Sequence, residues 1–311
     1  MTRAQSSLAL LVLLVIGGGW GLTQPLSKIA VSTGYQHFGL IFWQLAISSL
    51  ALLVIMVIKQ KRLPRSRPAI LACLIIALIG TVIPNSASFQ AIVHLPVGIV
   101  SILLSLIPMM AFPMALSLSL EPFELRRLLG LVVGLVGVLI LILPDSALPD
   151  RGMIVWIPLA LVAPLCYAFE GVYVAKWGTS GLDPVELLFG ASIIGTAIAL
   201  PLALGSGQFI SPFVVWGAAE WALVGSSLIH VSTYAGYIWL VAFAGAIFAV
   251  QVSYVVTASA VIWAMLILGE TYSPAFWASM GLVLSGVFLV QPRRSDLLAP
   301  SPLLSETDER A

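Results

Sequence analysis

Charged residues are scarce in this chain. They make up 9% of its 311 residues, and hydrophobic residues make up 60%. Because soluble domains carry about 25% charged residues, an ordinary soluble fold is excluded. A net charge of only +1 argues against a nucleic-acid partner. The composition instead predicts an all-α polytopic membrane protein, since a membrane-spanning helix needs about 20 mostly apolar residues.

Cysteine and histidine are also rare, and motifs for catalysis are missing. Cys73 and Cys166 both fall inside apolar stretches, which indicates neither a disulfide nor a metal site. The three histidines, His37, His94 and His230, are scattered along the chain, so no histidine metal site is expected. The sequence has no HExxH, GxSxG, Walker or dinucleotide-binding motif. We therefore expect no cofactor and no enzyme, and a secondary carrier or uniporter rather than a nucleotide-driven pump.

Apolar stretches that suit transmembrane helices run almost the whole length of the chain. The ten predicted spans are 7–27, 38–58, 69–91, 96–119, 127–143, 153–175, 186–204, 218–242, 247–268 and 275–291. The first resembles a signal peptide, with Arg3 before an apolar run. It continues without a small-residue cleavage site, so we interpret it as a retained transmembrane helix.

Lysine and arginine predict the orientation, because cytoplasmic flanks carry the excess of these residues. With the N-terminus inside, the internal segments hold 12 of the 14, namely Arg3, Lys59, Lys61, Arg62, Arg65, Arg67, Arg126, Arg127, Lys176, Arg293, Arg294 and Arg310. The external segments hold only Lys28 and Arg151. The prediction is a multi-pass protein of the inner (plasma) membrane with both termini cytoplasmic. A cysteine at Ser66 should then label from inside, and one at Ser146 from outside.

The second half of the chain repeats the first at an offset of 149 residues, which separates Glu121 from Glu270. In each half an apolar span, a glutamate and a Gly-Val pair follow in the same order. Five spans per half is an odd number, so the sequence predicts two inverted five-helix repeats, 7–143 and 153–292, and a disordered cytoplasmic tail at 293–311. Glu121 and Glu270 are either exposed loop acids or acceptors for backbone N–H groups where the following helix starts.

Small residues and prolines are placed where helices would pack or bend. Gly130, Gly134 and Gly137 share a face of the fifth span, and Ser279, Ser285 and Gly286 are predicted to serve similarly in the tenth. Packing within the fold is favoured over a dimer contact, although a homodimer stays open. The interior prolines are Pro25, Pro84, Pro108, Pro113, Pro158 and Pro164, which predict bent helices around a cavity.

Polar and aromatic residues form one stripe on each of several spans. A stripe of this kind cannot face lipid, so a shared cavity is the arrangement that accommodates all of them. The predicted substrate-binding residues are Trp20, Gln24, Gln44, Asn85, Tyr167, Glu170, His230, Tyr234, Tyr237, Gln251 and Tyr254.

Glu170 and His230 are the ionisable groups predicted to lie in span interiors, where such groups are functional candidates. They are the candidates for proton coupling, in which substrate would displace a proton from a shared polar site. The competing interpretation is facilitated diffusion, with Glu170 reaching the interface and His230 bonding a neighbouring helix.

Several short segments, taken in order, resemble one family. They are Trp20-Gly21 with Lys28, Pro96-Val97-Gly98, Ser105 to Pro108, Leu120-Glu121, Gly130, Gly137-Val138, Gly269-Glu270-Thr271 and Gly286-Val287. The chain thus resembles the EamA-type proteins of the drug/metabolite transporter superfamily over roughly residues 8 to 292. It departs at Gln44, where members often carry arginine, and at Thr257, where a proline is expected. These departures put family-typical charge recognition in doubt.

The resemblance implies a substrate cavity between helices one to four and six to nine, with helices five and ten at the periphery. Family substrates include amino acids, other metabolites and toxic organic compounds. We therefore predict alternating-access transport of a small metabolite or amphipathic organic compound, with export as the direction that the resemblance favours. The expected partners are this substrate and the lipid bilayer. The alternatives are a membrane-embedded sensor or scaffold that binds a ligand without moving it, and an intramembrane enzyme.

Overall fold

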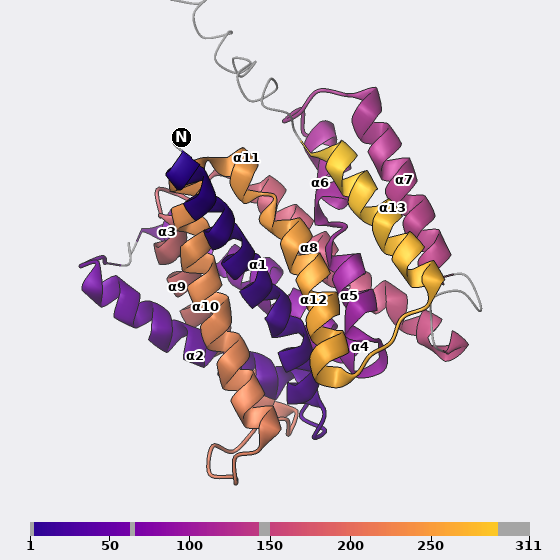
Figure 1. The fold of residues 1–311 in the computed structure, drawn as a ribbon. Helices are drawn as coiled ribbons and strands as arrows, with labels where there is room; N and C mark the ends of the chain where they lie inside the picture. Colours follow the sequence, from indigo (N-terminus) through magenta and orange to yellow (C-terminus); the bar gives the residue numbers. More distant parts are fainter. Residues whose placement is uncertain (1–2, 63–65, 143–149, 292–311) are drawn as a thin grey trace, which may run out of the picture.

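The computed structural model describes residues 3–62, 66–142 and 150–291, and within these ranges its regular secondary structure is entirely helical (Figure 1). Eight helical stretches are long and apolar enough to cross a membrane, and two shorter apolar helices follow them. The predicted all-α polytopic fold is therefore confirmed. The predicted tail 293–311, and with it Arg293, Arg294 and Arg310, lies outside the described residues, as does Ser146.

The helices follow the predicted spans closely, with ends that differ by a few residues. They are α1 Arg3–Val31, α2 His37–Ile58, α3 Arg67–Ile76, η1 Ala77–Val82, α4 Ile83–His94, α5 Val97–Leu104, α6 Ile107–Ser117, α7 Leu125–Ile142, η2 Arg151–Trp156, α8 Ile157–Trp177, α9 Pro184–Gly205, α10 Ala218–Ala244, α11 Ala246–Ala249, α12 Val252–Leu268 and α13 Pro274–Val290. Four of the ten spans, the third, fourth, sixth and ninth, are thus built from more than one helical segment.

The breaks within spans fall mostly where proline removes a backbone donor. In the third span a π-helix, η1, separates α3 from α4, and Pro84 stands in the first turn of α4. In the fourth span α5 ends at Leu104, and Pro108 stands in the first turn of α6. The ninth span is broken between Ala249 and Val252 without a proline.

The chain alternates between two ends of the helix bundle. We call the end where α1 starts the amino end and the end where α1 finishes the distal end. At the distal end, Tyr35 donates a hydrogen bond to Glu220 at the start of α10. At the amino end, Lys61 beyond α2 pairs with Asp183, which caps α9. Loops that the alternation assigns to the same end therefore meet each other.

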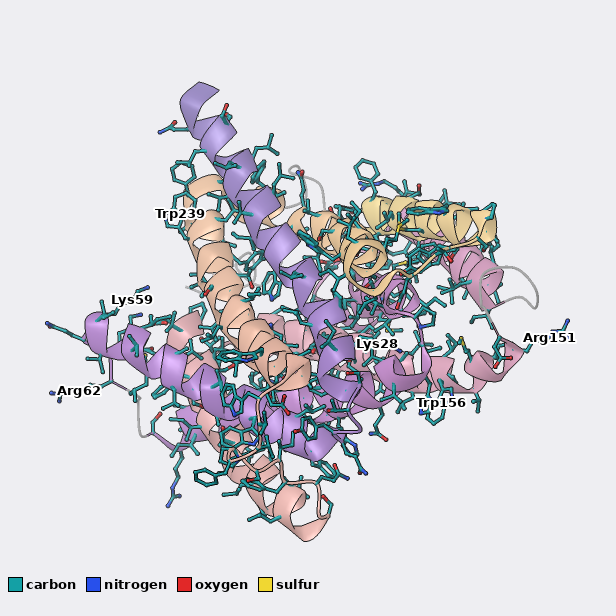
Figure 2. All side chains as sticks on the ribbon, turned by 60° about the horizontal axis from the view of Figure 1, so that its bottom comes forward. Lys28, Lys59, Arg62, Arg151, Trp156 and Trp239 are labelled. Atoms are coloured by element: carbon teal, nitrogen blue, oxygen red, sulfur yellow. The ribbon has the colours of Figure 1, made fainter. Side chains whose placement is uncertain are left out.

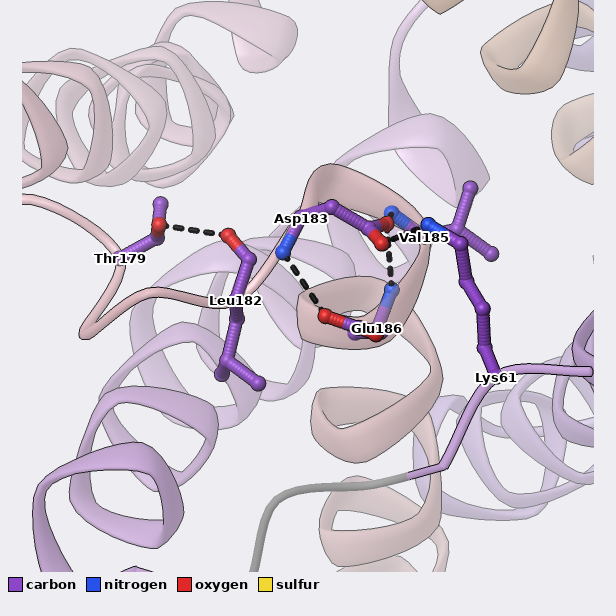
Figure 3. A network of polar contacts seen from close by, with 6 residues as sticks. All are labelled: Lys61, Thr179, Leu182, Asp183, Val185 and Glu186. Carbon is purple, nitrogen blue, oxygen red and sulfur yellow. Dashed lines mark hydrogen bonds and ion pairs between the residues drawn. The ribbon is translucent and has the colours of Figure 1, made fainter.

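A capping box at the start of α9 strengthens the amino end (Figure 3). The Asp183 carboxylate accepts the backbone N–H of Val185 at 2.8 Å and that of Glu186 at 3.2 Å. The Glu186 carboxylate accepts the backbone N–H of Asp183 at 3.0 Å. Because Asp183 also pairs with Lys61, one carboxylate both caps α9 and ties it to the end of α2.

Helix packing repeats between the two halves. In the first half α1 packs against α10 and α12, and in the second α8 packs against α4 and α6. Helices α2 and α9 pack together, as do α7 and α13, which lie side by side at the edge of the bundle (Figure 1). Since α1 runs from the amino end to the distal end and α8 runs the other way, the two five-helix halves are inverted.

Small residues bring α7 and α13 into close contact, as predicted. Ser279 donates to the carbonyl of Gly137 at 2.7 Å, and a Cβ added at Gly130 would lie 2.7 Å from the carbonyl oxygen of Gly286. Ser285 was wrongly predicted to share this contact. It is exposed and bonds to Gly281 of its own helix, because it lies on the far side of α13.

Candidate functional site

A cavity of about 440 Å³ lies in the middle of the bundle. Side chains from α1, α2, α3, η1, α4, α5, α6, α8, α9, α10 and α12 line it. Helices α7 and α13 contribute no lining residue, and they form the peripheral pair described above. Helices one to four and six to nine of the predicted numbering thus enclose a common space.

Most of the residues predicted to face a shared cavity do line it. These are Trp20, Gln24, Gln44, Asn85, Tyr167, Glu170, His230, Tyr234 and Tyr237. Helical spacing was sufficient to find them, because each lies on a single uninterrupted face of its helix.

Gln251 and Tyr254, also predicted to face the cavity, are not among the residues that line it. Gln251 is exposed at the break between α11 and α12. Tyr254 lies beside a second hollow, next to Leu284 and Phe288 of α13. The break resets the helical phase, so α12 presents Val252, Ser253, Val256 and Thr257 to the cavity instead.

Other lining residues were missed. Thr23 and Ser27 line the cavity one turn apart on α1, and their spacing from Trp20 was a usable signal. Gly80 also lines it, but nothing in the sequence marks that glycine as different from the others.

One hydrogen-bonded chain crosses the cavity wall from α8 to α2. The Tyr167 hydroxyl donates to the side-chain oxygen of Asn85 at 3.0 Å. The Asn85 amide donates to the side-chain oxygen of Gln44, also at 3.0 Å. This arrangement fixes the orientation of both amides and ties α2, α4 and α8 together.

A second polar contact joins α1 to α10. The indole N–H of Trp20 donates to Nδ1 of His230 at 3.1 Å. Indole nitrogen is a donor only, so Nδ1 must be unprotonated and the imidazole neutral. The Trp20 ring also lies 5.7 Å from the Tyr237 ring, measured between ring centroids. His230 therefore bonds a neighbouring helix, as one of the two sequence interpretations expected.

Glu170 is the one carboxylate among the lining residues, and these include no lysine or arginine. Its carboxyl group packs against Gly80 of η1, where an added Cβ would lie 2.8 Å from all three carboxyl atoms. Within the part of the chain that the structure describes, no hydrogen bond or ion pair reaches this carboxylate. Glu170 is thus a partly buried acid that faces the cavity without a partner.

At the distal end of the bundle, polar contacts gather around α4 and α5. The Lys28 ammonium donates to the carbonyls of Ile92, Val93 and Leu95. Through these bonds α1 is held against the link between α4 and α5, on the distal side of the cavity.

A second distal contact joins the two halves through Glu270. Its carboxylate accepts the backbone N–H of Val97 at 3.0 Å, and the Tyr272 hydroxyl accepts that of Gly98 at 3.0 Å. Tyr272 in turn donates to Glu270. Glu270 therefore caps a helix start. The prediction named the start of the following helix, α13, whereas the structure shows the start of α5 in the other half.

Glu121 has a different role from Glu270, although a shared one was predicted. Its carboxylate pairs with Arg127, whose side chain is 2% exposed and also lies 3.5 Å from Glu124. The Arg127 guanidinium stacks over Phe112. Within the described residues, α8 makes no contact with α10 or α12 comparable to those of α1 with α4 and α5. The symmetry of the two halves is therefore broken at the amino end.

The lysine and arginine side chains labelled in Figure 2 lie in separate regions of the protein. Lys59 and Arg62 project from the end of α2, Arg151 stands at the start of η2, and Lys28 lies among the helices. The alternation of the helices puts Lys59 and Arg62 at the amino end and Lys28 and Arg151 at the distal end.

Comparison with known proteins agrees with this architecture. The model of the EamA-like transporter family matches residues 7–143 and again residues 154–291. A solved structure, described only as "Crystal structure of protein", is similar with a TM-score of 0.61 at 15% identity. The similarity covers 91% of this chain and 97% of that one, and it supports the fold alone. No curated protein sequence matches. The two family matches span most of the chain, and it therefore belongs to the EamA-like transporter family, a family of multi-pass membrane transporters within the drug/metabolite transporter superfamily.

Proposed function

We propose that this protein is a secondary carrier that moves a small metabolite or amphipathic organic compound across the plasma membrane by alternating access. The observation that carries the proposal is the central cavity, which polar and aromatic side chains from both inverted halves line together. Such a mixed lining suits a ligand with an apolar body and a few polar groups. A volume of about 440 Å³ fits a small molecule rather than a peptide chain.

The broken symmetry supports alternating access. Inverted repeats give a carrier two equivalent conformations, in which one half and then the other closes the pathway. Here α1 closes on α4 and α5 at the distal end, and among the described residues its counterpart α8 makes no comparable closure at the amino end. We assign this conformation to the state in which the cavity faces the amino end.

The amino end is the cytoplasmic side in this proposal. Lys59, Lys61 and Arg62 follow α2 there, and Arg126 and Arg127 begin α7. Because cytoplasmic flanks carry the excess of lysine and arginine, both termini are assigned to the cytoplasm. A cavity that faces the cytoplasm is ready to load an export substrate, which agrees with export as the direction.

If a proton gradient drives transport, Glu170 is the better of the two predicted proton carriers. Protonation of His230 at Nδ1 would place its N–H directly opposite the indole N–H of Trp20, which already donates to that nitrogen. Two donors in this position repel each other. The Glu170 carboxylate has no such competing donor among the described residues. A proton on Glu170 and a substrate in the cavity would then exclude each other.

A flux screen in liposomes tests the proposal. The purified protein is reconstituted, and uptake of amino acids and organic compounds is compared with empty liposomes, with and without a pH gradient. At least one compound should show flux that saturates with concentration. If no compound across a broad panel exceeds the empty liposomes, the protein is not a carrier of this kind.

A further inference from the structure

Few ionisable side chains line the cavity. Among the described lining residues, Glu170 is the only acid and His230 the only other ionisable group apart from tyrosines. Trp20 holds His230 as neutral imidazole. When Glu170 is ionised, the cavity therefore carries one negative charge and no positive charge to balance it.

The backbone makes room for this carboxylate. Gly80 lies in η1, a single π-helical segment inside the third span, and π-helical turns are frequent at functional sites. Any side chain at position 80 would force the carboxyl group to move, because its Cβ would lie 2.8 Å from the carboxyl carbon and both oxygens. A glycine at this point thus permits an acid to stand in the wall without a protein partner.

Aromatic rings surround the same space. Tyr167 lies one turn from Glu170 on α8, and Tyr234 and Tyr237 face the cavity from α10. The Tyr234 and Tyr237 hydroxyls accept or donate no hydrogen bond within the described residues, so both remain available to a ligand. Faces of aromatic rings attract cations, and this attraction adds to that of a nearby carboxylate.

We infer that the cavity selects an organic cation, an ammonium group carried on an apolar or aromatic body, and that Glu170 is the residue that binds the ammonium. This inference rests on the proposed function and names its substrate class. An unpaired charge in a partly buried site is unfavourable, and a cationic ligand removes that penalty by pairing with Glu170. An anionic ligand of the same shape would bring a second negative charge into a cavity without a cation.

Three ligands that differ only in the terminal group measure this selectivity. They are phenethylammonium, phenethyl alcohol and phenylpropionate, which carry a positive, a neutral and a negative group on the same aromatic body. Equilibrium binding to the purified protein is measured at pH 7.5. We expect phenethylammonium to bind at least about tenfold more tightly than either of the others, which corresponds to about 1.4 kcal/mol.

Glu170→Gln should abolish this preference, because the amide keeps the shape and removes the charge. Gly80→Ala is a second variant that leaves Glu170 in place and displaces its carboxyl group. It should also weaken binding of phenethylammonium more than binding of phenethyl alcohol. The matched control is Glu186→Gln, outside the cavity, where an amide can still accept the N–H of Asp183 in the capping box. This variant should retain the full preference.

The outcomes separate this inference from the proposed function. Equal binding of the three ligands, tighter binding of phenylpropionate, or an undiminished preference in Glu170→Gln overturns the inference. Flux without any charge preference would agree with the proposed transport function, but it would overturn the inference of cation selectivity. Binding of phenethylammonium that depends on Glu170, without flux of any compound, would uphold the cation site and contradict transport.

Discussion

Glu270 and Glu121 occupy equivalent positions in the two halves, yet they bind different partners. Glu270 accepts the backbone N–H of Val97 and thereby joins the second half to the first at the distal end. Glu121 pairs with Arg127 of its own half at the amino end. The sequence repeat therefore defines a common scaffold, and the contacts between halves define which end is closed.

Glu121 makes a contact within one half, whereas Glu270 makes contacts between the two halves. The ion pair of Arg127 lies within one half, so it should persist when the carrier changes conformation. The bonds of Glu270 and Lys28 lie at the distal end, so in the proposed transport cycle they should break when the cavity turns to the other side. Variants of the two glutamates should accordingly affect different properties, folding stability for Glu121 and the conformational equilibrium for Glu270.

The largest expected effect is that of Glu121→Gln on stability. It removes the charge that pairs with the buried Arg127 guanidinium, and removal of one partner from a buried ion pair is unfavourable by about 3 kcal/mol. Unfolding of the purified protein in denaturant should show this loss. Glu124→Gln is the control, and its effect should be smaller because that contact is longer. Equal losses would contradict the assigned role of Glu121.

The α7–α13 pair, where the two halves do match, should give equal effects from both sides. Gly130→Ala and Gly286→Ala each place a Cβ against the backbone of the opposite helix, which should destabilise the protein by about 1–3 kcal/mol. Gly281→Ala on α13 is the control, because its added Cβ meets open space. It should be neutral or slightly stabilising. If Gly130→Ala left the stability unchanged, the two helices would have to be farther apart than in the structure.

Glu270→Ala should shift the conformational equilibrium more than it changes stability. It removes the acceptor for the Val97 N–H and the partner of Tyr272, and a shift of about 1.4 kcal/mol would raise the population open at the distal end about tenfold. Labelling of a cavity cysteine from the distal side reports this population. Tyr272→Phe removes the bonds of the hydroxyl to Gly98 and Glu270 but keeps the charged acceptor of the Val97 N–H, so it should give a smaller increase. If neither variant increases distal labelling, Glu270 does not hold the closure.

The smallest effect should come from Tyr35 and appear only at high pH. Its hydrogen bond to Glu220 raises the pKa of the Tyr35 hydroxyl above its ordinary value of about 10. A raised pKa means that the folded state holds the proton more tightly, so stability from this contact is present below pH about 10 and is lost as the pH rises through the raised pKa. Unfolding measured against pH should show this loss, and Tyr35→Phe should remove the pH dependence. An unchanged profile in that variant would assign the loss to another group.

Much of the fold was predictable because apolar length and lysine and arginine placement are local properties of the sequence. The cavity-facing residues on α1, α4, α8 and α10 followed from helical periodicity. Gln251 and Tyr254 did not, because a break without proline changed the helical phase ahead of α12. The partner of Glu270 was not predictable either, since the Val97 N–H lies 173 positions away and is brought close only by the packing of the two halves.

In the proposed state the cavity opens to the amino end and is closed at the distal end. Cysteine accessibility from the two sides measures this difference. Ser88→Cys and Ser253→Cys both line the cavity and are introduced separately after Cys73 and Cys166 are replaced by alanine. A membrane-impermeant thiol reagent is applied to either side. We expect both positions to label from the amino side much faster than from the distal side, and Glu270→Ala to increase distal labelling. Faster labelling from the distal side, or equal rates from both sides, would contradict the account.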